Sequence, residues 1–493
     1  MGLRWTRDIL ASQLRERTEM NAVEPSHDRI FDSRRRIRRI GLLSPTSGNL
    51  GNATMQAAMI ANLRKRIPGI EIVGITLNPD ETRRRHEIEA FPLAAVSRPY
   101  YTLIPSNGLG TRRQPTRAVS SIKEQLKRIP VLGAALRTIG ICNAELAHIR
   151  AVARFVSKLD GVLIPGGGAL DDFWGGPWGQ PWSLFKFAVL SRARSVPFLF
   201  VSVGKCSLAH PLSRWFARAA MKLAAYRSYR DSDSKTAVHA LLGACDDPVY
   251  PDLAFSYPLP NTEASLRSCS QDGRLLIGVS PIAYCDPRAW PRKDEPRYRE
   301  YVIQLAEMVK WLIRENHRVL FFTTDHADSE TVRDVQTIIA GSTLDADAIQ
   351  TLPGSIEQSP GSLLKGISRA DLTIASRLHG VILSHLNATP VLALSFDPKV
   401  DAHMNAVGQK DYCLNIDHLS LDRLVERFTA LKAARKQVQE HLNSVALGFR
   451  DLLDQQYDRI LGAPFVNPMT DYNRRPIPQA EIGHFESNDS RIR

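Results

Sequence analysis

The sequence has few of the features that mark secreted, membrane-spanning or metal-stapled proteins. It contains only 6 cysteines in 493 residues, and none of them forms a CxxC or zinc-binding pattern. No apolar run approaches the length of a membrane-spanning helix, and residues 1–20 are charged throughout, without the apolar core of a secretion signal. These absences predict a reduced, cytoplasmic protein, and a chain of this length can bury a core without disulfides or a structural metal.

Fingerprints of the common nucleotide-binding loops are also missing. The Gly-Asn turn Ser47–Asn52 joins a predicted strand to a predicted helix, but its spacing fits neither the Rossmann fingerprint nor a Walker loop. Asp171 and Asp172 are adjacent and lack a third acidic partner at a suitable spacing, which makes them poor metal ligands. We therefore predict no metal and no bound cofactor.

Positive charge, by contrast, is abundant. The formal net charge is +13, and the densest cluster is Arg34–Arg39. A cationic cluster can bind nucleic acid, an anionic membrane surface or phosphorylated substrates, or it can be a solvated arm. Interleaved aromatic residues, which single-strand nucleic-acid platforms need, are missing around it, so nucleic acid is not a predicted partner.

From residue 37 onward, short apolar strands alternate with helical segments. Ile40–Leu43, a helix over 53–66 and Ile70–Ile75 form a strand–helix–strand unit, which predicts a parallel sheet. Residues 83–121 are polar and poorly periodic, and we expect an irregular insertion there. A long helix is predicted over Leu421–Leu453. The predicted organisation is a basic arm over 1–36, an α/β domain over 37–260, a second α/β domain over 272–430, a closing helix over 431–466 and a mobile tail over 467–493.

The strongest site signal lies in the second domain. Arg377, His379 and Gly380 follow a predicted buried strand, and Asp397 and Lys399 follow the next one. In open α/β sheets, ligands bind outside the carboxyl ends of parallel strands, where helix N-termini favour anions. Arginine, lysine and histidine at this edge suit a small dianion such as a phosphate, and a histidine can also move a proton near neutral pH. The alternative is that the charges lie on the surface and the histidine is a hydrogen-bonded core residue.

Two loops of the first domain are further candidates. Asn49, Gly51 and Asn52 belong to the Gly-Asn turn, which either holds a polar ligand close to the backbone or is a plain turn with a helix cap. The Gly166–Gly168 run precedes Asp171 and Asp172, whose carboxylates could orient sugar hydroxyls. Three tryptophans nearby could form a platform for a sugar ring or pack beneath a loop: Trp174, Trp178 and Trp182.

Taken in order along the chain, these motifs resemble the polysaccharide pyruvyl transferase family. The resemblance covers residues 37–430 and rests on Gly48–Gly51, Gly166–Gly168, Arg230-Asp231 with Ser234, Pro251-Asp252, Arg377–Gly380 and Pro390–Lys399. One departure stands at Asn52-Ala53, where many members carry Asp-Glu. An acid that acts there in other members is missing in this chain, although Asn52 can still orient a hydroxyl.

The resemblance implies two Rossmann-like domains that face a cleft, as in the glycosyltransferase B-type fold. It implies transfer of a pyruvyl group from phosphoenolpyruvate to a sugar hydroxyl of a polysaccharide or its lipid-linked precursor, forming a ketal. Such acceptors would permit contact with the inner face of the membrane. The alternatives are a nucleotide-sugar glycosyltransferase on the same fold and a non-catalytic polysaccharide-assembly protein.

On this reading each candidate residue has an expected role. His379 would act as general acid or base, with Arg377 beside it, and Arg377 and Lys399 would hold the anionic groups of the donor. Arg230 would bind a second anionic group. Gly380 and Asp397 would also line the donor side. The acceptor side would contain Asn49, Gly51, Asn52, Gly167, Gly168, Asp171 and Asp172.

Overall fold

The computed structural model describes most of the chain between residues 37 and 461. The described ranges are 37–44, 48–95, 130–172, 175–204, 208–244, 246–259, 274–290, 292–341, 346–355 and 358–461, with the backbone alone for 130–138. The predicted arm over 1–36, the predicted tail over 467–493, Trp174 and residues 96–121 of the predicted insertion lie outside them.

The first domain contains a parallel six-stranded sheet in the order β3-β2-β1-β4-β5-β6. Its strands are β1 (Arg39–Leu43), β2 (Glu71–Thr76), β3 (Glu89–Pro92), β4 (Gly161–Pro165), β5 (Phe198–Val203) and β6 (Tyr226–Tyr229). Its helices are α2 (Leu50–Arg66), α3 (Pro79–His86), α5 (Pro130–Val156), α6 (Gln180–Ala193), α7 (Pro211–Leu223) and α8 (Ser232–Leu242). This strand order is that of the Rossmann fold.

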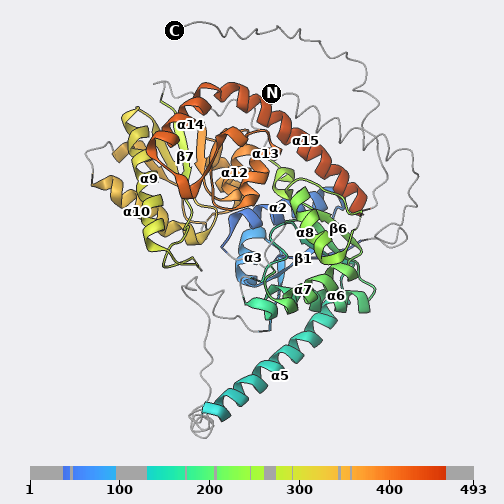
Figure 1. The fold of residues 1–493 in the computed structure, drawn as a ribbon. Coiled ribbons are helices and arrows are strands. Elements are labelled where there is room, and N and C mark those ends of the chain that lie inside the picture. The colour runs from blue at the N-terminus through green and yellow to red at the C-terminus, as the bar shows by residue number, and fades with distance from the viewer. Residues whose placement is uncertain are drawn as a thin grey trace, which may run out of the picture.

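The second domain repeats this topology, with the order β12-β11-β10-β7-β8-β9. Its strands are β7 (Leu276–Ser280), β8 (Arg318–Phe321), β9 (Ile349–Thr351), β10 (Leu372–Ala375), β11 (Val391–Ser395) and β12 (Cys413–Asn415). Its helices are α9 (Glu295–Arg314), α10 (Ser329–Ala340), α11 (Pro360–Ile367), α12 (Leu378–Leu386), α13 (Pro398–Ala406) and α14 (Leu421–Ala433). The predicted class of two doubly wound α/β domains is confirmed (Figure 1).

The central strands are apolar because both faces of each sheet are covered. β4, β7, β10 and β11 are buried along their whole length, which is why they occur in the sequence as continuous apolar runs. One hydrophobic cluster crosses from the first domain to the second and includes Met59, Phe255, Val381 and Tyr457. The two sheets are therefore joined by a shared apolar core as well as by the chain.

The last helix, α15 (Arg435–Leu461), returns from the second domain to the first (Figure 1). Arg66 on α2 pairs with Asp454 at 2.8 Å and with Asp458 at 2.7 Å. The hydroxyls of Tyr457 and Ser256 lie 3.0 Å apart in a buried hydrogen bond. These contacts fasten α15 across the domain boundary.

Two predictions of local structure are wrong. The helix predicted over 421–453 is two helices, because the chain leaves α14 at Ala434 to run across to the first domain, and no glycine or proline marks that change. Residues 83–92, predicted as irregular, contain the end of α3 and the strand β3. β3 lies at the sheet edge and is half exposed, so its sequence lacks the apolar pattern of a central strand.

Candidate active site

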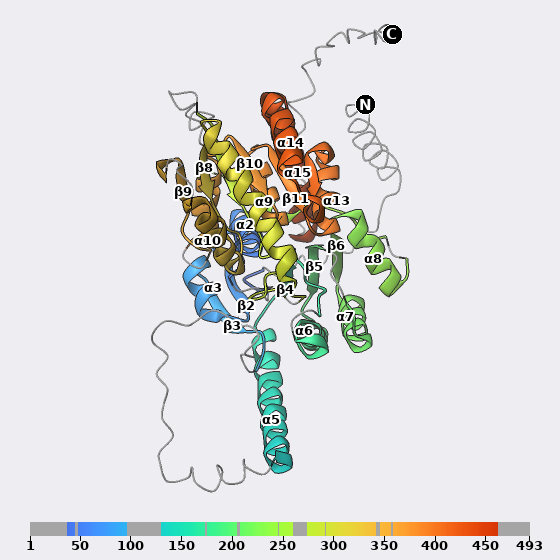
Figure 2. The same cartoon turned by 60° about the vertical axis from the view of Figure 1, so that its left-hand side comes forward.

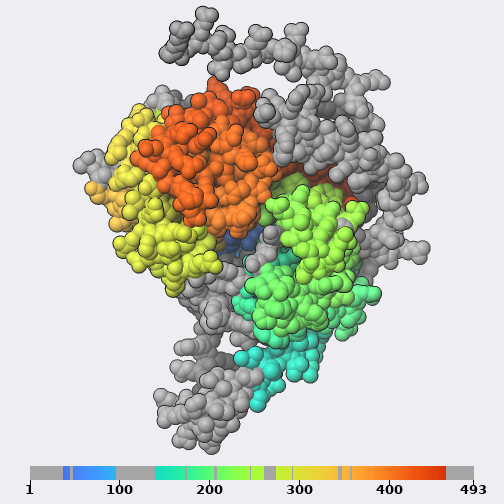
Figure 3. All heavy atoms as spheres, in the orientation of Figure 1, coloured from blue at the N-terminus to red at the C-terminus, as the bar shows by residue number. Residues whose placement is uncertain are grey.

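The Gly-Asn turn at the start of α2 connects the two domains directly. The backbone N–H of Leu50 donates to the carbonyl of Thr324 at 2.8 Å, and that of His326 donates to the carbonyl of Gly48 at 3.1 Å. Asn49 donates from Nδ2 to Asp325 at 2.8 Å, while its Oδ1 caps α2 by accepting from the N–H of Asn52 at 2.9 Å. In the space-filling view, blue atoms of the first domain are visible in the furrow between the two domains (Figure 3). Asn49 therefore holds the domain junction together.

His379 lies at this junction, in the first turn of α12. A Cβ atom added to Gly51 would lie 2.1 Å from Cγ of His379, so the imidazole occupies the space that only a glycine leaves open on α2. The side chain is 14% exposed, and its Nε2 lies 3.8 Å from a carboxylate oxygen of Asp252. Among the described residues this nitrogen has no hydrogen-bond partner. The structure thus places a buried, unpartnered imidazole nitrogen between the two domains.

The surroundings of His379 favour its neutral form. Burial lowers its pKa to about 4, because the charged ring would lose its hydration. Asp252 opposes this effect, whereas Arg230, Lys399 and Arg377 lower the pKa further. At neutral pH the ring is therefore an uncharged base beside several cations.

Arg230, at the end of β6, is one of the cations near His379. Its Nη1 lies 3.5 Å from Asp252 and its Nε donates to Asp231 at 3.3 Å. A Cβ atom on Gly204 would lie 2.6 Å from Nη2 of Arg230, so Gly204 leaves room for the guanidinium. Asp252 accepts a hydrogen bond from the N–H of Ala254 at 2.9 Å, and its second oxygen faces both Arg230 and His379. The Pro251-Asp252 motif alone indicates no role for Asp252, and the structure places this residue between Arg230 and His379.

Arg377 has a different environment from the one expected of a donor-binding residue. Its guanidinium makes a two-point ion pair with Asp328, whose side chain is fully buried, and Nη1 lies 3.9 Å from Asp325. Burial works against the charge of Arg377, but the two carboxylates outweigh it and raise its pKa. Arg377 thus anchors the start of α12 to the turn after β8.

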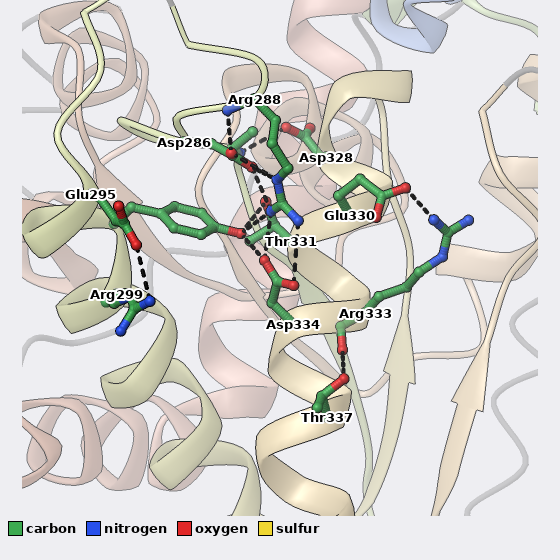
Figure 4. Close-up of polar contacts among 12 residues, drawn as sticks. Asp286, Arg288, Glu295, Arg299, Asp328, Glu330, Thr331, Arg333, Asp334 and Thr337 are labelled. Carbon is green, nitrogen blue, oxygen red and sulfur yellow. Dashed lines mark hydrogen bonds and ion pairs between the residues drawn. The ribbon is translucent and has the colours of Figure 1, made fainter. Parts of the chain in front are cut away.

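Asp328 lies beside a polar network of the second domain (Figure 4). Arg288 contacts Asp286 at 2.7 Å and Asp334 at 2.5 Å, which ties the loop after β7 to α10. The N–H of Ala283 in that loop donates to Asp328 at 2.9 Å. Arg377 is therefore paired with a carboxylate that is itself fixed.

The remaining donor-side candidates surround the beginning of α12 and α13. Nζ of Lys399 lies 3.1 Å from Asp397, and the Lys399 side chain is 40% exposed. Asp397 also caps α13 by accepting from the N–H of Lys399 at 3.0 Å. A Cβ atom on Gly380 would lie 3.3 Å from Oγ of Ser280, so this glycine allows α12 to begin close to β7. In contrast to α13, α12 has no side-chain hydrogen bond at its N-cap, Arg377.

The acceptor-side candidates divide into two groups. Gly51 and Asn52 adjoin the site, and the Oδ1 atom of Asn52 lies 3.1 Å from the position of a Cβ on Gly167, which has a φ of 71°. Asp172 instead accepts from the N–H groups of Ala209 and His210 at 3.1 and 2.8 Å and so holds the loop before α7. Gly168 is exposed and Asp171 half-buried.

Two histidines that sequence analysis missed lie behind the site. Nδ1 of His385 and Nε2 of His403 are 3.1 Å apart, and the rings stack. Burial lowers the pKa of His403 to about 4, an effect that Asp252 opposes and that Arg230 and His379 reinforce. The spacing of His379, His385 and His403 on two separate helices gives no sequence pattern that could have identified the pair.

Two of the three tryptophans pack against α7, although Trp178 is also 54% exposed. Trp178 and Trp182 contact Phe216 edge-on at 5.8 and 5.3 Å, while Trp174 lies outside the described residues.

Within the described ranges, no group of three or more histidine, cysteine or acidic side chains could hold a metal ion. No helix in that part of the chain is long and apolar enough to cross a membrane. The absence of metal and cofactor from the reaction stays a prediction.

Comparison with solved structures finds this fold in sugar-nucleotide enzymes. A UDP-GlcNAc 2-epimerase from Neisseria meningitidis, bound to UDP-GlcNAc, aligns with a TM-score of 0.50 at 12% identity, over 86% of this chain and all of that chain. Another UDP-N-acetylglucosamine 2-epimerase aligns with a TM-score of 0.50 at 10% identity, over 91% and 100%. At such identities the likeness shows the fold alone, a two-domain glycosyltransferase B-type arrangement.

Comparison at the level of sequence is more specific. No curated protein matches the chain. The sequence model of the polysaccharide pyruvyl transferases matches residues 49–398, a span that runs from the Gly-Asn turn to the start of α13 and contains the whole site described above except Lys399 and His403. The chain belongs to the polysaccharide pyruvyl transferase family.

Proposed function

We propose that the protein transfers the pyruvyl group of phosphoenolpyruvate to hydroxyls of a sugar in a polysaccharide or its lipid-linked precursor. The observation that carries the proposal is the neutral, unpartnered Nε2 of His379 beside Arg230 and Lys399. A base surrounded by cations fits a donor that brings both a phosphate and a carboxylate. Family membership supports the reaction class, and the site supports the type of donor.

The reaction requires two hydroxyls for a ketal. One oxygen bonds to C2 of the donor as the methylene carbon gains a proton and becomes a methyl group. The second oxygen bonds to the same carbon as the bond from C2 to the phosphate oxygen breaks. Of the two hydroxyl protons, one balances the new methyl hydrogen and the other leaves with inorganic phosphate.

The residues of the site can serve these steps as follows. His379 takes a hydroxyl proton at Nε2, and Asp252, 3.8 Å away, stabilises the imidazolium that results. Arg230 and Lys399 hold the anionic groups of the donor, together with the backbone N–H groups at the start of α12, which no side chain caps. Arg377 acts through its ion pair with Asp328, which fixes the helix that carries His379.

The acceptor side would lie along Gly51, Asn52 and Gly167, next to His379. Asn52 replaces the acid of many relatives and can donate or accept a hydrogen bond to a sugar hydroxyl. Where the acceptor carries a lipid, catalysis would take place at the inner face of a membrane.

Thermal unfolding with candidate donors tests the donor class. We expect phosphoenolpyruvate to raise the Tm, since a ligand at about 100 times its Kd contributes about 2.7 kcal/mol. Arg230→Met and Lys399→Met should weaken that shift, whereas Arg369→Met, at an exposed site on the second domain, should leave it unchanged. A shift with UDP-GlcNAc and none with phosphoenolpyruvate would replace this proposal with a nucleotide-sugar transferase.

A further inference from the structure

A continuous group of aromatic side chains emerges on the surface of the first domain, over the 3-10 turn η2 (Gly176–Trp178), α6 and α7. Trp178 and Trp215 are each 54% exposed. Both rings contact the buried ring of Phe216, at centroid distances of 5.8 and 5.3 Å. Trp215 also contacts Phe185 at 5.2 Å. The two exposed tryptophans are therefore held rigidly, with about half of each side chain in water.

The charged residues of α6 and α7 have one sign. Neither α6 nor α7 contains an aspartate or a glutamate. Their exposed charged residues are Arg192, Arg214, Arg218 and Lys222. This face thus combines exposed tryptophan with positive charge and carries no acidic residue on either helix.

Helix α5, which packs beside α6, also carries exposed apolar side chains. Ile139, Ile141 and Leu146 are 56%, 57% and 51% exposed. Glu145, between them, accepts from Nε1 of Trp182 at 2.8 Å and pairs with Lys186 at 2.7 Å, which joins α5 to α6. In both ribbon views the N-terminal half of α5 projects from the end of the domain where α6 and α7 lie (Figures 1 and 2).

We propose that this face, the docking face of α5, α6 and α7, binds the surface of an anionic lipid bilayer. Tryptophan is enriched at the level of lipid headgroups, where its ring is part apolar and part polar. Aliphatic side chains enter the acyl boundary, and arginine and lysine are attracted by anionic headgroups. A protein bound through these side chains would lie on the bilayer surface.

Other occupants fit this face less well. A second copy packed symmetrically on it would bring two sets of Arg214, Arg218 and Lys222 into one interface, and like charges repel. Single-stranded nucleic acid stacks on successive aromatic rings, whereas the exposed apolar side chains of α5 are aliphatic.

The docking face adjoins the acceptor side of the candidate site. Gln180 at the start of α6 donates to the carbonyls of Ala169 at 2.6 Å and Gly168 at 3.3 Å, so the face begins at the edge of the triple-glycine loop. An acceptor anchored in the same bilayer would reach the site from this side. That consequence rests on the proposed function, but the binding of lipid itself does not.

Flotation of the full-length protein with vesicles tests the proposal. We expect binding to vesicles of phosphatidylglycerol and phosphatidylcholine in equal parts, weakened by salt, and little binding to phosphatidylcholine alone. Trp178→Ser with Trp215→Ser should lower the partition coefficient about tenfold or more. Arg218→Glu with Lys222→Glu should do the same, and these exposed substitutions leave the packing of the aromatic rings intact.

A matched control removes exposed apolar side chains elsewhere. Ile303→Ser with Leu447→Ser alters residues that are 47% and 51% exposed on α9 and α15, and should leave vesicle binding unchanged. Circular dichroism and phosphoenolpyruvate-dependent Tm shifts confirm that each variant is folded and keep this test separate from that of the donor.

Several results would overturn the proposal. Wild-type protein could fail to float with anionic vesicles, or the docking-face variants could float as well as wild type. Binding could depend on Arg34–Arg36 alone. Sedimentation could show a dimer that the tryptophan variants dissociate, or the same variants could abolish binding to single-stranded RNA while vesicle binding persists.

Discussion

The substitution Gly51→Ala tests the geometry on which the site depends, because it adds one methyl group at the point where α2 meets His379. That methyl carbon would lie 2.1, 2.2 and 2.4 Å from Cγ, Nδ1 and Cβ of the histidine. Cβ and Cγ lie close to the backbone of His379, so a rotation of the ring about the bond that joins them cannot move them away. The imidazole or the start of α2 must therefore shift by roughly 1 Å or more, since ordinary contacts begin near 3.4 Å.

The expected consequences for stability and activity differ in size. Alanine favours a helix over glycine by up to about 1 kcal/mol, whereas overpacking costs about 1–3 kcal/mol, so the net loss of stability is about 0–2 kcal/mol. A misplacement of about 1 Å at a catalytic group can lower turnover about 100-fold. We expect a folded enzyme with strongly reduced kcat and a smaller change in KM.

Steady-state kinetics of pyruvyl transfer, with phosphate release as the readout, measures this effect. The matched control is Gly448→Ala on α15, where a Cβ atom would meet nothing within 4 Å and activity should be retained. In a His379→Ala background, Gly51→Ala should have no further effect on kcat. Full turnover by Gly51→Ala alone would refute the placement of His379 or its role.

The other predictions concern the ion pair, the histidines and the helix cap. Arg377→Met leaves Asp328 buried without its partner, so the free energy of unfolding, measured in urea, should fall by about 3–5 kcal/mol. If the variant kept its stability and only its KM for the donor changed, the anchoring role of Arg377 would be contradicted. His379 and His403 have folded-state pKa values near 4, below the ordinary 6.5, so stability should be full above pH 6.5 and decline by up to about 1.4 kcal/mol per pH unit per histidine between pH 6.5 and 4. A pH titration of Tm that stays flat there, or is unchanged by His403→Asn, would argue against this. Asn49→Ala removes a helix cap and a contact between domains and should cost about 1–2 kcal/mol, while an unchanged urea midpoint would show that neither contact matters.

The architecture could be predicted from sequence because central strands of parallel sheets are buried on both faces. Leu372–Ala375 and Val391–Ser395 could be recognised as strands from their apolar runs alone. The edge strand Glu89–Pro92 could not, since half of its surface faces solvent. The division between α14 and α15 was also hidden, because it follows from tertiary packing against the first domain.

The site was predictable in part for a related reason. Residues that follow parallel strands gather at one edge, so Arg230, His379 and Lys399 could be expected to converge. What Arg377 pairs with could not be expected, because Asp328 lies 49 residues away in a turn whose position depends on how α10 packs. His403 likewise reaches His385 only through the packing of α13 on α12.

Mass spectrometry of glycans incubated with the enzyme and phosphoenolpyruvate tests the central claim most directly. We predict a product heavier than the acceptor by pyruvic acid less one water, formed with one equivalent of phosphate and missing with His379→Ala. Product of the same mass from the His379→Ala variant at the wild-type rate would contradict the role of His379. The same panel of acceptors would also be incubated with a nucleotide sugar. If the enzyme glycosylated an acceptor from that sugar but added no pyruvate to it from phosphoenolpyruvate, the result would contradict pyruvyl transfer itself.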